Sequence, residues 1–261
     1  MYTIFIAGTA GSGKSLLTSN LLEWYNSNDI TPISINLDPG VVNLPYSPDV
    51  DVRDFIDIYS IMENYNLGPN GSLILANDLI STKLSEIQNQ VDELNPDYII
   101  VDTPGQIELF AFRSSGPYFV SNFFSDNKVT LFTIDGTLAE SPINYVSLMF
   151  LSQSVKLRLN TSQINVLTKR DKIIDKLNEV LEWSNSISSL QNSLDKEKNF
   201  EQSLLSKDLI KTLFKSGHIT NPIAISNITM NGMINLSAAL SRIFTQGEEG
   251  ERGEEKNSPE M

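Results

Sequence analysis

The sequence predicts an α/β fold in which a mostly parallel sheet is covered by helices on both faces. Two observations carry this prediction. The chain has 261 residues, 40% of them hydrophobic, which is enough for one large domain with a full core. It also contains short apolar runs typical of buried strands, and helical patterns separate most of them. The runs are Tyr2–Ala7, Thr31–Leu37, Tyr98–Val101, Val129–Ile134, Gln163–Leu167 and Pro222–Ile225.

The first run leads into a glycine-rich turn, Gly8-Thr9-Ala10-Gly11-Ser12-Gly13-Lys14-Ser15, and then into a helical pattern, Leu16–Tyr25. This order predicts a phosphate-binding loop (P-loop), because the glycines let backbone N–H groups and the positive end of the helix face phosphate oxygens. Lys14 supplies charge for the outer phosphates, and the Ser15 hydroxyl suits a magnesium ion. The alternative is a glycine-rich turn that matches by chance. We predict a P-loop NTPase fold whose nucleotide contacts include Gly8, Thr9, Ala10, Gly11, Ser12, Gly13, Lys14, Ser15 and Leu16.

The second run ends in Asn36-Leu37-Asp38-Pro39, which places Asp38 at the ligand edge of the sheet. Three prolines then predict an irregular loop. We expect the next helix to span about Val52–Tyr65 and a Gly68-Pro69-Asn70-Gly71 turn to end it. Ser72 can cap a long helix that continues to about Leu94.

The third run is followed by Asp102-Thr103-Pro104-Gly105-Gln106. A carboxylate at a strand end before a Pro-Gly turn is the Walker B layout of many GTPases. Asp102 can hold a magnesium ion or its bound water, Gly105 lets the backbone approach the terminal phosphate, and Gln106 is placed to orient the attacking water. Alternatively, Asp102 simply caps the turn.

The fifth run ends in Thr168-Lys169-Arg170-Asp171, which resembles the guanine-reading motif Asn-Lys-x-Asp. A carboxylate at Asp171 can accept hydrogen bonds from guanine N1–H and N2–H, whereas adenine has no N1–H. The Lys169 stem can cover the base. Thr168 replaces the usual Asn with a shorter hydroxyl. The alternative for Thr168–Asp171 is a charged strand-to-helix turn. Ser226-Asn227, after the sixth run, lies where a backbone N–H can reach guanine O6.

The remaining segments predict the domain organisation. Residues 1–244 read as a single P-loop GTPase domain, with a polar helical insertion at about 172–215 packed over the nucleotide end of the sheet. We expect the final helix at about Met233–Phe244. The Glu/Gly-rich tail, 245–261, has no apolar side chains to bury, so we expect it to be disordered.

Composition excludes several classes of function. The formal net charge of −13 argues against a general nucleic-acid surface. With no cysteine and a single histidine, His218, zinc sites and Ser-His-Asp catalysis have little support. No apolar run approaches a membrane span, and the first strand begins at Tyr2, so we expect no signal peptide and a cytoplasmic protein.

Together, the motifs resemble those of the GPN-loop GTPases, and they occur in that family's order along nearly the whole chain. The absence of cysteine and the short tail are similar to a prokaryotic, archaeal-type member of the SIMIBI class. The motifs are Gly8–Ser15, Asn36–Pro39, Asp51-Val52-Arg53-Asp54, Gly68-Pro69-Asn70, Asp102–Gln106, Thr168–Asp171 and Ser226.

The resemblance implies a magnesium-dependent GTPase that yields GDP and phosphate and works as a homodimer joined across its nucleotide faces. The Gly68-Pro69-Asn70 loop then reaches the partner's active site, where Asn70 contacts the terminal phosphate region. Asp38 acts near the magnesium ion and the water, as a base or as an anchor, so that Ser15, Asp38 and Asp102 surround the metal. Eukaryotic relatives assist assembly of RNA polymerase, which implies a protein client.

Two other functions remain open at this stage. One is an assembly chaperone that binds nucleotide with little turnover and uses the 172–215 helices as its client surface. The other is an ATP-dependent kinase-like enzyme on the same sheet, although the sequence contains no obvious acceptor-binding arginine cluster.

Overall fold

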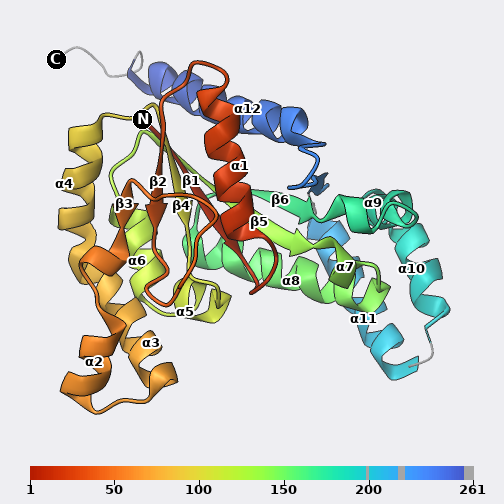
Figure 1. Cartoon of the computed structure of the whole chain (residues 1–261). Helices are drawn as coiled ribbons and strands as arrows, with labels where there is room; N and C mark the ends of the chain where they lie inside the picture. Colours follow the sequence, from red (N-terminus) through yellow and green to blue (C-terminus); the bar gives the residue numbers. More distant parts are fainter. Residues whose placement is uncertain (198–199, 217–220, 256–261) are drawn as a thin grey trace.

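The computed structural model describes residues 1–197, 200–216 and 221–255 and confirms the predicted α/β fold. Its centre is one sheet whose seven strands are all parallel, in the order β3-β2-β4-β1-β5-β6-β7 (Figure 1). Since all strands run the same way, their carboxyl ends meet at one edge of the sheet. The strands are β1 (Tyr2–Gly8), β2 (Pro32–Asn36), β3 (Val50–Asp51), β4 (Tyr98–Asp102), β5 (Asn127–Asp135), β6 (Ser162–Thr168) and β7 (Ile223–Ala224).

Each predicted apolar run overlaps one of these strands, and four of the strands extend one or two residues beyond the predicted ends. The prediction missed β3, a two-residue edge strand that pairs with the end of β2. So short a strand carries no periodicity of its own, and only its pairing with β2 makes it visible.

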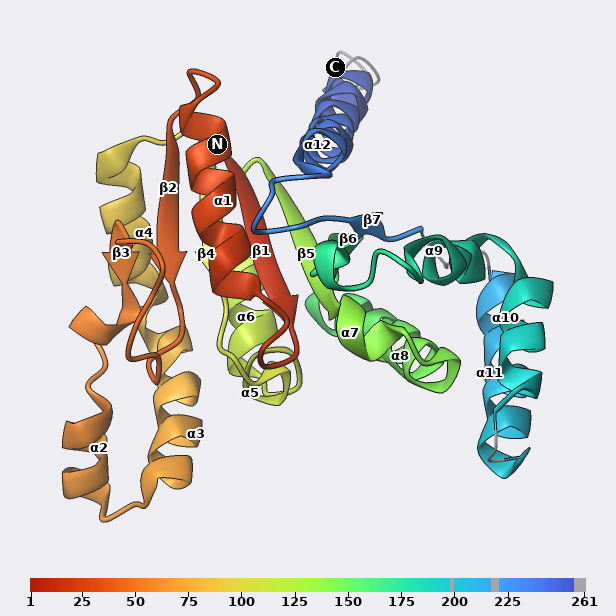
Figure 2. The same cartoon turned by 45° about the vertical axis from the view of Figure 1, so that its right-hand side comes forward.

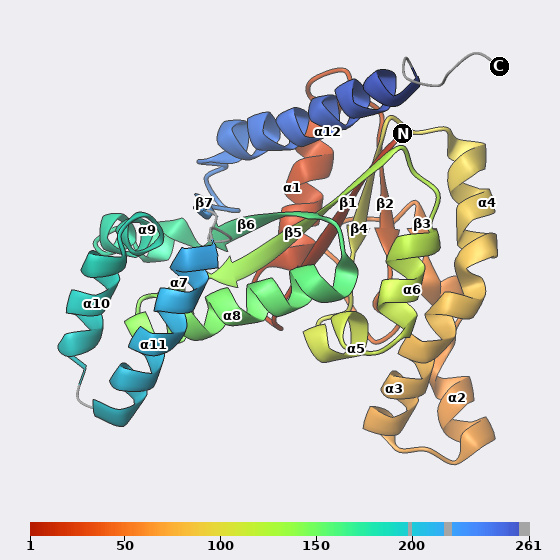
Figure 3. The same ribbon diagram turned by 180° about the vertical axis from the view of Figure 1, so that it is seen from behind.

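Alternate side chains of each strand enter two separate cores, as the strand period of two requires. Ile4 and Ile6 of β1 face α1 (Lys14–Asn26) and α12 (Met233–Glu255). Phe5 and Ala7 face the larger core on the other side. Figure 3 shows that second face, which is covered by α4, α6 and α8. Its α-helices are α3 (Pro69–Leu79), α4 (Leu84–Leu94), α5 (Ile107–Ala111), α6 (Ser115–Asn122), α7 (Gly136–Ala139) and α8 (Pro142–Leu159).

The predicted helix Val52–Tyr65 is wrong in its first part. Val52–Asp54 forms a short 3-10 helix, η1, and α2 begins only at Ile58 and ends at Tyr65. Asp57 starts α2, because its carboxylate accepts hydrogen bonds from the backbone N–H groups of Tyr59 and Ser60. The capping side chain therefore sets a helix start that the apolar spacing alone had placed too early.

The predicted helix from Ser72 to Leu94 is also wrong. The helix starts earlier, at Pro69 with Gly68 as N-cap, and the Ser72 hydroxyl lies inside the first turn, where it donates to the Gly68 carbonyl. Proline suits this first position because its missing N–H would have no partner there. The 3-10 segment η2 (Ile80–Lys83) then separates α3 from α4.

The helices of the 172–215 segment lie beside the sheet rather than over its nucleotide end. They are α9 (Leu177–Asn185), α10 (Ile187–Asp195) and α11 (Phe200–Ser216), preceded by the 3-10 turn η3 (Arg170–Lys172). Figure 2 shows them beyond β7, and their buried residues share the α8 core. Apolar burial against α8 explains this placement.

The chain after Phe244 also differs from the prediction of a disordered tail, because α12 continues to Glu255. Glutamate, glutamine and arginine are good helix formers, and extending an existing helix avoids the cost of nucleation. Residues 256–261 and His218 lie outside the described residues. In the ranges that the structure describes, no helix has the length and apolar character needed to cross a bilayer.

Gly116 tests how closely α6 packs against α5. A Cβ atom at this position would lie 2.0 Å from the Phe110 carbonyl oxygen, which is backbone and cannot rotate away. We expect Gly116→Ala to lower the free energy of unfolding by about 1–3 kcal/mol in urea denaturation. Gly71→Ala is the matched control in α3, where a Cβ meets only Leu67 at 3.5 Å; it should leave stability unchanged or raise it by up to about 1 kcal/mol. Equal urea midpoints for the two variants would contradict the close packing of α6 against α5 at Gly116.

Candidate functional site

A cavity of about 350 Å³ opens where β1, β2 and β4 end. It lies between the start of α1 and the loop that follows β2. Seven residues predicted for the site line it together, namely Gly11, Gly13, Lys14, Ser15, Leu16, Asp38 and Asp102, joined by Val41, Leu44, Pro45, Thr103 and Gly105.

The backbone of the Gly8–Ser15 turn requires glycine at two points. A Cβ on Gly8 would lie 2.1 Å from the Thr133 hydroxyl and 2.6 Å from the Thr133 carbonyl oxygen. Gly13 has φ +89° and forms the N-cap of α1, where no side chain caps the helix. The first turn of α1 therefore presents backbone N–H groups without a side-chain acceptor, as an anion site requires.

Buried hydroxyl groups hold this turn against β5 and β6. The Ser12 hydroxyl donates to Thr9 O at 2.7 Å and lies 2.7 Å from the Thr133 hydroxyl of β5. The Thr168 hydroxyl at the end of β6 donates to Ser12 O at 2.8 Å and lies 3.1 Å from Ile134 O. The shorter side chain at Thr168 therefore keeps a direct contact with the phosphate-loop turn.

Lys14 is buried, and its ammonium group donates to three backbone carbonyls. The acceptors are Gly8 O at 3.1 Å, Thr9 O at 3.0 Å and Gly105 O at 3.3 Å. Burial lowers the pKa of Lys14, while the carboxylates of Asp102 and Asp38 oppose this shift. The side chain is thus a desolvated cation held at the mouth of the cavity.

Asp102 is a buried carboxyl group at the end of β4, only 2% exposed. Burial raises its pKa to about 6, although the Ser15 and Tyr46 hydroxyls and the Lys14 charge favour the ionised form. Its Oδ2 accepts a hydrogen bond from the Tyr46 hydroxyl at 3.0 Å. Among the residues that the structure describes, its Oδ1 is buried without a hydrogen-bond partner, which marks a place for a further ligand.

Asp38 joins the loop after β2 to the turn after β4. Its Oδ2 accepts the Gly105 N–H at 2.9 Å, and its Oδ1 accepts the Gly40 N–H at 2.9 Å. Gln106, the next residue after Gly105, is exposed and begins α5 without capping it. Both Asp38 oxygens therefore hold backbone amides close to the carbonyl that Lys14 contacts.

The donor set fits a magnesium ion better than an all-protein metal cage. Among the described residues, no group of three acidic, histidine or cysteine side chains gathers to hold a metal. Magnesium instead takes one or two carboxylates, a hydroxyl, waters and substrate phosphates. Ser15 and Asp102 beside the phosphate-loop turn, with the unpartnered Asp102 Oδ1, match that pattern.

The segment Thr168–Asp171 follows β6 and is tied to β7. The Arg170 N–H donates to Ile225 O at 3.1 Å. Lys169 adopts a left-handed backbone conformation with φ +56°, and its ammonium contacts Asp135 Oδ2 at 2.5 Å. Asp171 is partly exposed within η3. The Thr168–Asp171 segment does not line the phosphate cavity. The predicted base site and the predicted phosphate site are therefore separate neighbours, joined by the hydrogen bond from Thr168 to Ser12.

The Ser226-Asn227 segment contacts the same turn from the other side. The Asn227 side chain donates to Gly13 O at 3.2 Å, and Asn20 of α1 donates to Asn227 O at 2.9 Å. The Ser226 N–H already donates to Asn231 O at 3.0 Å. Of the two residues predicted to reach guanine O6, Ser226 therefore has its backbone donor engaged within its own turn.

Gly68, Pro69 and Asn70 stand apart from the cavity of their own chain. They join α2 to α3 in a hairpin that projects away from the sheet (Figure 1). None of them lines the phosphate cavity.

The residues missed from the sequence include three whose side chains hydrogen-bond to site residues: Asn20, Tyr46 and Thr133. Thr133 and Asn20 lie inside an ordinary strand and helix, so their spacing carries no signal. Tyr46 lies between Pro45 and Pro48, where the sequence indicated only an irregular loop.

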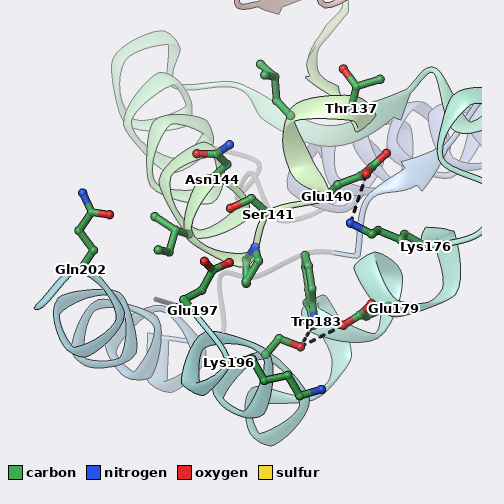
Figure 4. A pocket seen from close by; sticks show the side chains of 14 residues that line it. Thr137, Glu140, Ser141, Asn144, Lys176, Glu179, Trp183, Lys196, Glu197 and Gln202 are labelled. Carbon is green, nitrogen blue, oxygen red and sulfur yellow. Dashed lines mark hydrogen bonds and ion pairs between the residues drawn. The ribbon is translucent and has the colours of Figure 1, made fainter. Parts of the chain in front are cut away.

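A larger cavity, of about 650 Å³, lies between α7, the start of α8 and helices α9 and α10. Figure 4 shows Glu140 facing Lys176, and Trp183 donating to the Ser193 hydroxyl, which in turn donates to Glu179. Glu140 and Lys176 thus form an ion pair, whereas Glu179 accepts from an uncharged hydroxyl. The cavity contains none of the predicted site residues, so volume alone does not identify the site.

Comparison with known proteins identifies the family. A family model described as "Conserved hypothetical ATP binding protein" matches residues 6–246. The GPN-loop GTPase PAB0955 of Pyrococcus abyssi is 34% identical over 182 residues, which are 69% of this chain and 71% of that protein. The chain belongs to the GPN-loop GTPase family. The resemblance predicted from the motifs is thereby confirmed.

Other GPN-loop GTPases match over much of the chain. GPN-loop GTPase 1 of Saccharomyces cerevisiae is 32% identical over 200 residues, 76% of this chain and 51% of that protein. GPN-loop GTPase QQT2 of Arabidopsis thaliana is 30% identical over 233 residues, 87% of this chain and 60% of that protein. The chain therefore spans about half to three fifths of these relatives. The crystal structure of PAB0955, a GTPase in apo form, has a TM-score of 0.81 and 27% identity over 93% of this chain and 97% of that one.

Thr168 offers a direct test of the link between β6 and the phosphate-loop turn of this GPN-loop GTPase family member. Thr168→Val keeps the shape but removes the hydroxyl that donates to Ser12 O. We expect its affinity for a fluorescent guanine nucleotide to fall about 5- to 10-fold, the value of one buried hydrogen bond. Thr168→Ser, which keeps the hydroxyl, should bind like the wild type. Wild-type affinity in the valine variant would show that the contact does not support the site.

Proposed function

We propose that this chain binds and hydrolyses GTP with magnesium and acts as a dimeric switch in the cytoplasm. The observation that carries the proposal is the junction of three elements at one sheet edge. The Gly8–Ser15 turn, the buried Asp102 and the Thr168–Asp171 segment lie there, and the Thr168 hydroxyl joins the last of them to Ser12. Such a junction suits a nucleoside triphosphate whose phosphates and base lie at opposite ends.

Phosphate binding rests on Lys14 and the start of α1. Lys14 lies beside the carbonyls of Gly8 and Thr9, and its desolvated charge attracts phosphate strongly because little water screens it. The uncapped first turn of α1 adds N–H donors and the positive helix end. Ser15 and Asp102 would hold Mg²⁺, and the ion would supply positive charge to offset the charge that develops on the phosphates.

The switch rests on the Asp38–Gly105 contact. Asp38 Oδ2 holds the Gly105 N–H, and Lys14 donates to the Gly105 carbonyl. A terminal phosphate bound beside Lys14 would compete with both contacts. Phosphate is a stronger acceptor for the Lys14 ammonium than the neutral Gly105 carbonyl, and its negative charge would repel the Asp38 carboxylate from the Gly105 N–H. Release of Asp38 would free the loop after β2. Loss of the terminal phosphate would then let the Asp38–Gly105 contact form again and hold the loop in its present position.

Hydrolysis requires a water aligned with the terminal phosphorus. Gln106 is exposed next to Gly105 and is the residue that we assign to orient this water. Asp38 acts either as the base or as the anchor of that water. Lys14 and backbone N–H groups stabilise charge on the phosphate as the bond to the leaving group breaks.

Dimerisation would complete the site from the partner. The hairpin that carries Asn70 projects from the sheet, and its Tyr59 and Tyr65 side chains are exposed. The neighbouring Val42, in the loop after β2, is 81% exposed. Apolar side chains in such positions favour burial against a second copy, which would bring Asn70 to the partner's phosphate site.

Two observations bear on the other functions. No arginine lines the phosphate cavity among the described residues, which disfavours a kinase that must hold a second anionic substrate there. Leu204, Leu205 and Leu209 of α11 are partly exposed, which favours a client-binding surface on the insertion helices. A protein-assembly client, of the kind implied for eukaryotic relatives, would combine with the GTPase switch rather than replace it.

Asp171 tests the choice of base. Asp171→Asn replaces an acceptor of guanine N2–H with an amide that can also donate, which suits the C2 carbonyl of xanthine. We expect GTP affinity to fall by roughly 10²–10⁴, the loss of two charge-assisted hydrogen bonds, and XTP affinity to rise above that of the wild type. Calorimetric titration with each nucleotide measures both values. Unchanged GTP binding would remove Asp171 from the base site.

Asn70 tests the contribution of the partner's hairpin. Asn70→Ala should keep GTP affinity while GTP hydrolysis slows by about 10- to 100-fold, because a donor to the transition state is lost. Asn64→Ala, on the exposed surface of α2 in the same hairpin, is the matched control and should hydrolyse GTP like the wild type. Phosphate release at the wild-type rate in Asn70→Ala would exclude this catalytic role.

A further inference from the structure

The loop between β2 and β3 is attached to the rest of the chain at two points near its middle. The Ser19 hydroxyl of α1 donates to Pro45 O at 3.3 Å, and the Tyr46 hydroxyl donates to Asp102 Oδ2 at 3.0 Å. Arg53 fixes an earlier part of the loop, since its guanidinium donates to Val41 O at 3.1 Å. Of these contacts, only that of Tyr46 is made to an ionisable side chain lining the phosphate cavity.

The two oxygens of Asp102 have different surroundings. Tyr46 occupies Oδ2, whereas Oδ1 is buried and has no protein partner. A carboxylate with one oxygen hydrogen-bonded cannot rotate freely, so the direction of the other oxygen is fixed.

Resting on the magnesium-dependent function proposed above, we infer that Tyr46 is a positioning residue for the metal site. Its hydroxyl orients Asp102 so that this carboxylate is ready for the ion or its bound water. The same hydroxyl attaches the loop after β2, so ion occupancy and the position of that loop are coupled. Coupling of this kind is reciprocal. A change that displaces the loop lowers the affinity for the ion, and loss of the ion weakens the attachment of the loop.

A purely structural role makes a different prediction. If Tyr46 only packed the loop, Tyr46→Phe would keep that packing, because the ring is unchanged. If the hydroxyl orients Asp102, its loss lowers the affinity for Mg²⁺ specifically. Removing such a partner of a metal ligand typically lowers metal affinity by 10- to 100-fold.

The test follows dissociation of fluorescent mant-GDP from the full chain at a series of Mg²⁺ concentrations and in EDTA. For Tyr46→Phe we expect the Mg²⁺ concentration that gives half-maximal retention to rise about 10-fold or more, with an unchanged dissociation rate in EDTA. Tyr118→Phe, on the exposed surface of α6 and outside the lining of the phosphate cavity, is the control and should match the wild type.

The outcomes separate this inference from the proposed function. If the wild type needs Mg²⁺ to retain the nucleotide and Tyr46→Phe has the same half-maximal concentration or a lower one, the role of Tyr46 is wrong while the proposed function stands. If Tyr46→Phe accelerated mant-GDP dissociation equally in EDTA and in Mg²⁺, the role of Tyr46 would also be wrong, because the hydroxyl would then act on nucleotide binding rather than on the metal. If the wild type itself retains mant-GDP equally well without Mg²⁺, the magnesium-dependent function fails and the role of Tyr46 fails with it.

Discussion

The fixed position of Ser12 is the constraint on which the rest of the site depends. Its hydroxyl contacts Thr9 O and the Thr133 hydroxyl, and its carbonyl accepts the Thr168 hydroxyl. All of these groups are buried or nearly so, so water cannot replace the hydrogen bonds cheaply. The glycine-rich turn is therefore held at the ends of β1, β5 and β6 before any ligand binds, and binding needs little further ordering of the backbone.

That rigid turn explains how a charged lysine can be buried. Desolvating an ammonium group is costly unless acceptors and opposite charges surround it. Lys14 has three carbonyl acceptors, two of them from the turn itself and one from Gly105, with Asp102 and Asp38 close by. The contacts of Lys14 and Asp38 with Gly105 also join the turns after β1, β2 and β4. In the proposed switch, these direct contacts would couple the phosphate position to the loop after β2.

The sequence predicted the strands and the phosphate-loop turn well, because buried apolar runs and a glycine-rich turn leave strong local signals. It was wrong about helix ends, where capping residues and extension of an existing helix override the apolar spacing. Asp57 rather than Val52 starts α2, Pro69 rather than Ser72 starts α3, and α12 extends past Phe244. The motifs placed Lys14 and Asp102 in the same cavity, but Tyr46 and Thr133 act through side-chain contacts that no spacing indicates. The Thr168 contact with Ser12 also depends on how β6 pairs with β5.

The central claim is that these elements form a magnesium-dependent site for a guanine nucleoside triphosphate. Isothermal titration of the full chain with GTPγS and with ATPγS in Mg²⁺ tests it most directly. The contacts available at Asp171 predict that GTPγS binds at least about 100-fold more tightly, since adenine leaves the carboxylate without its N1–H partner. Equal or tighter binding of ATPγS would contradict the account.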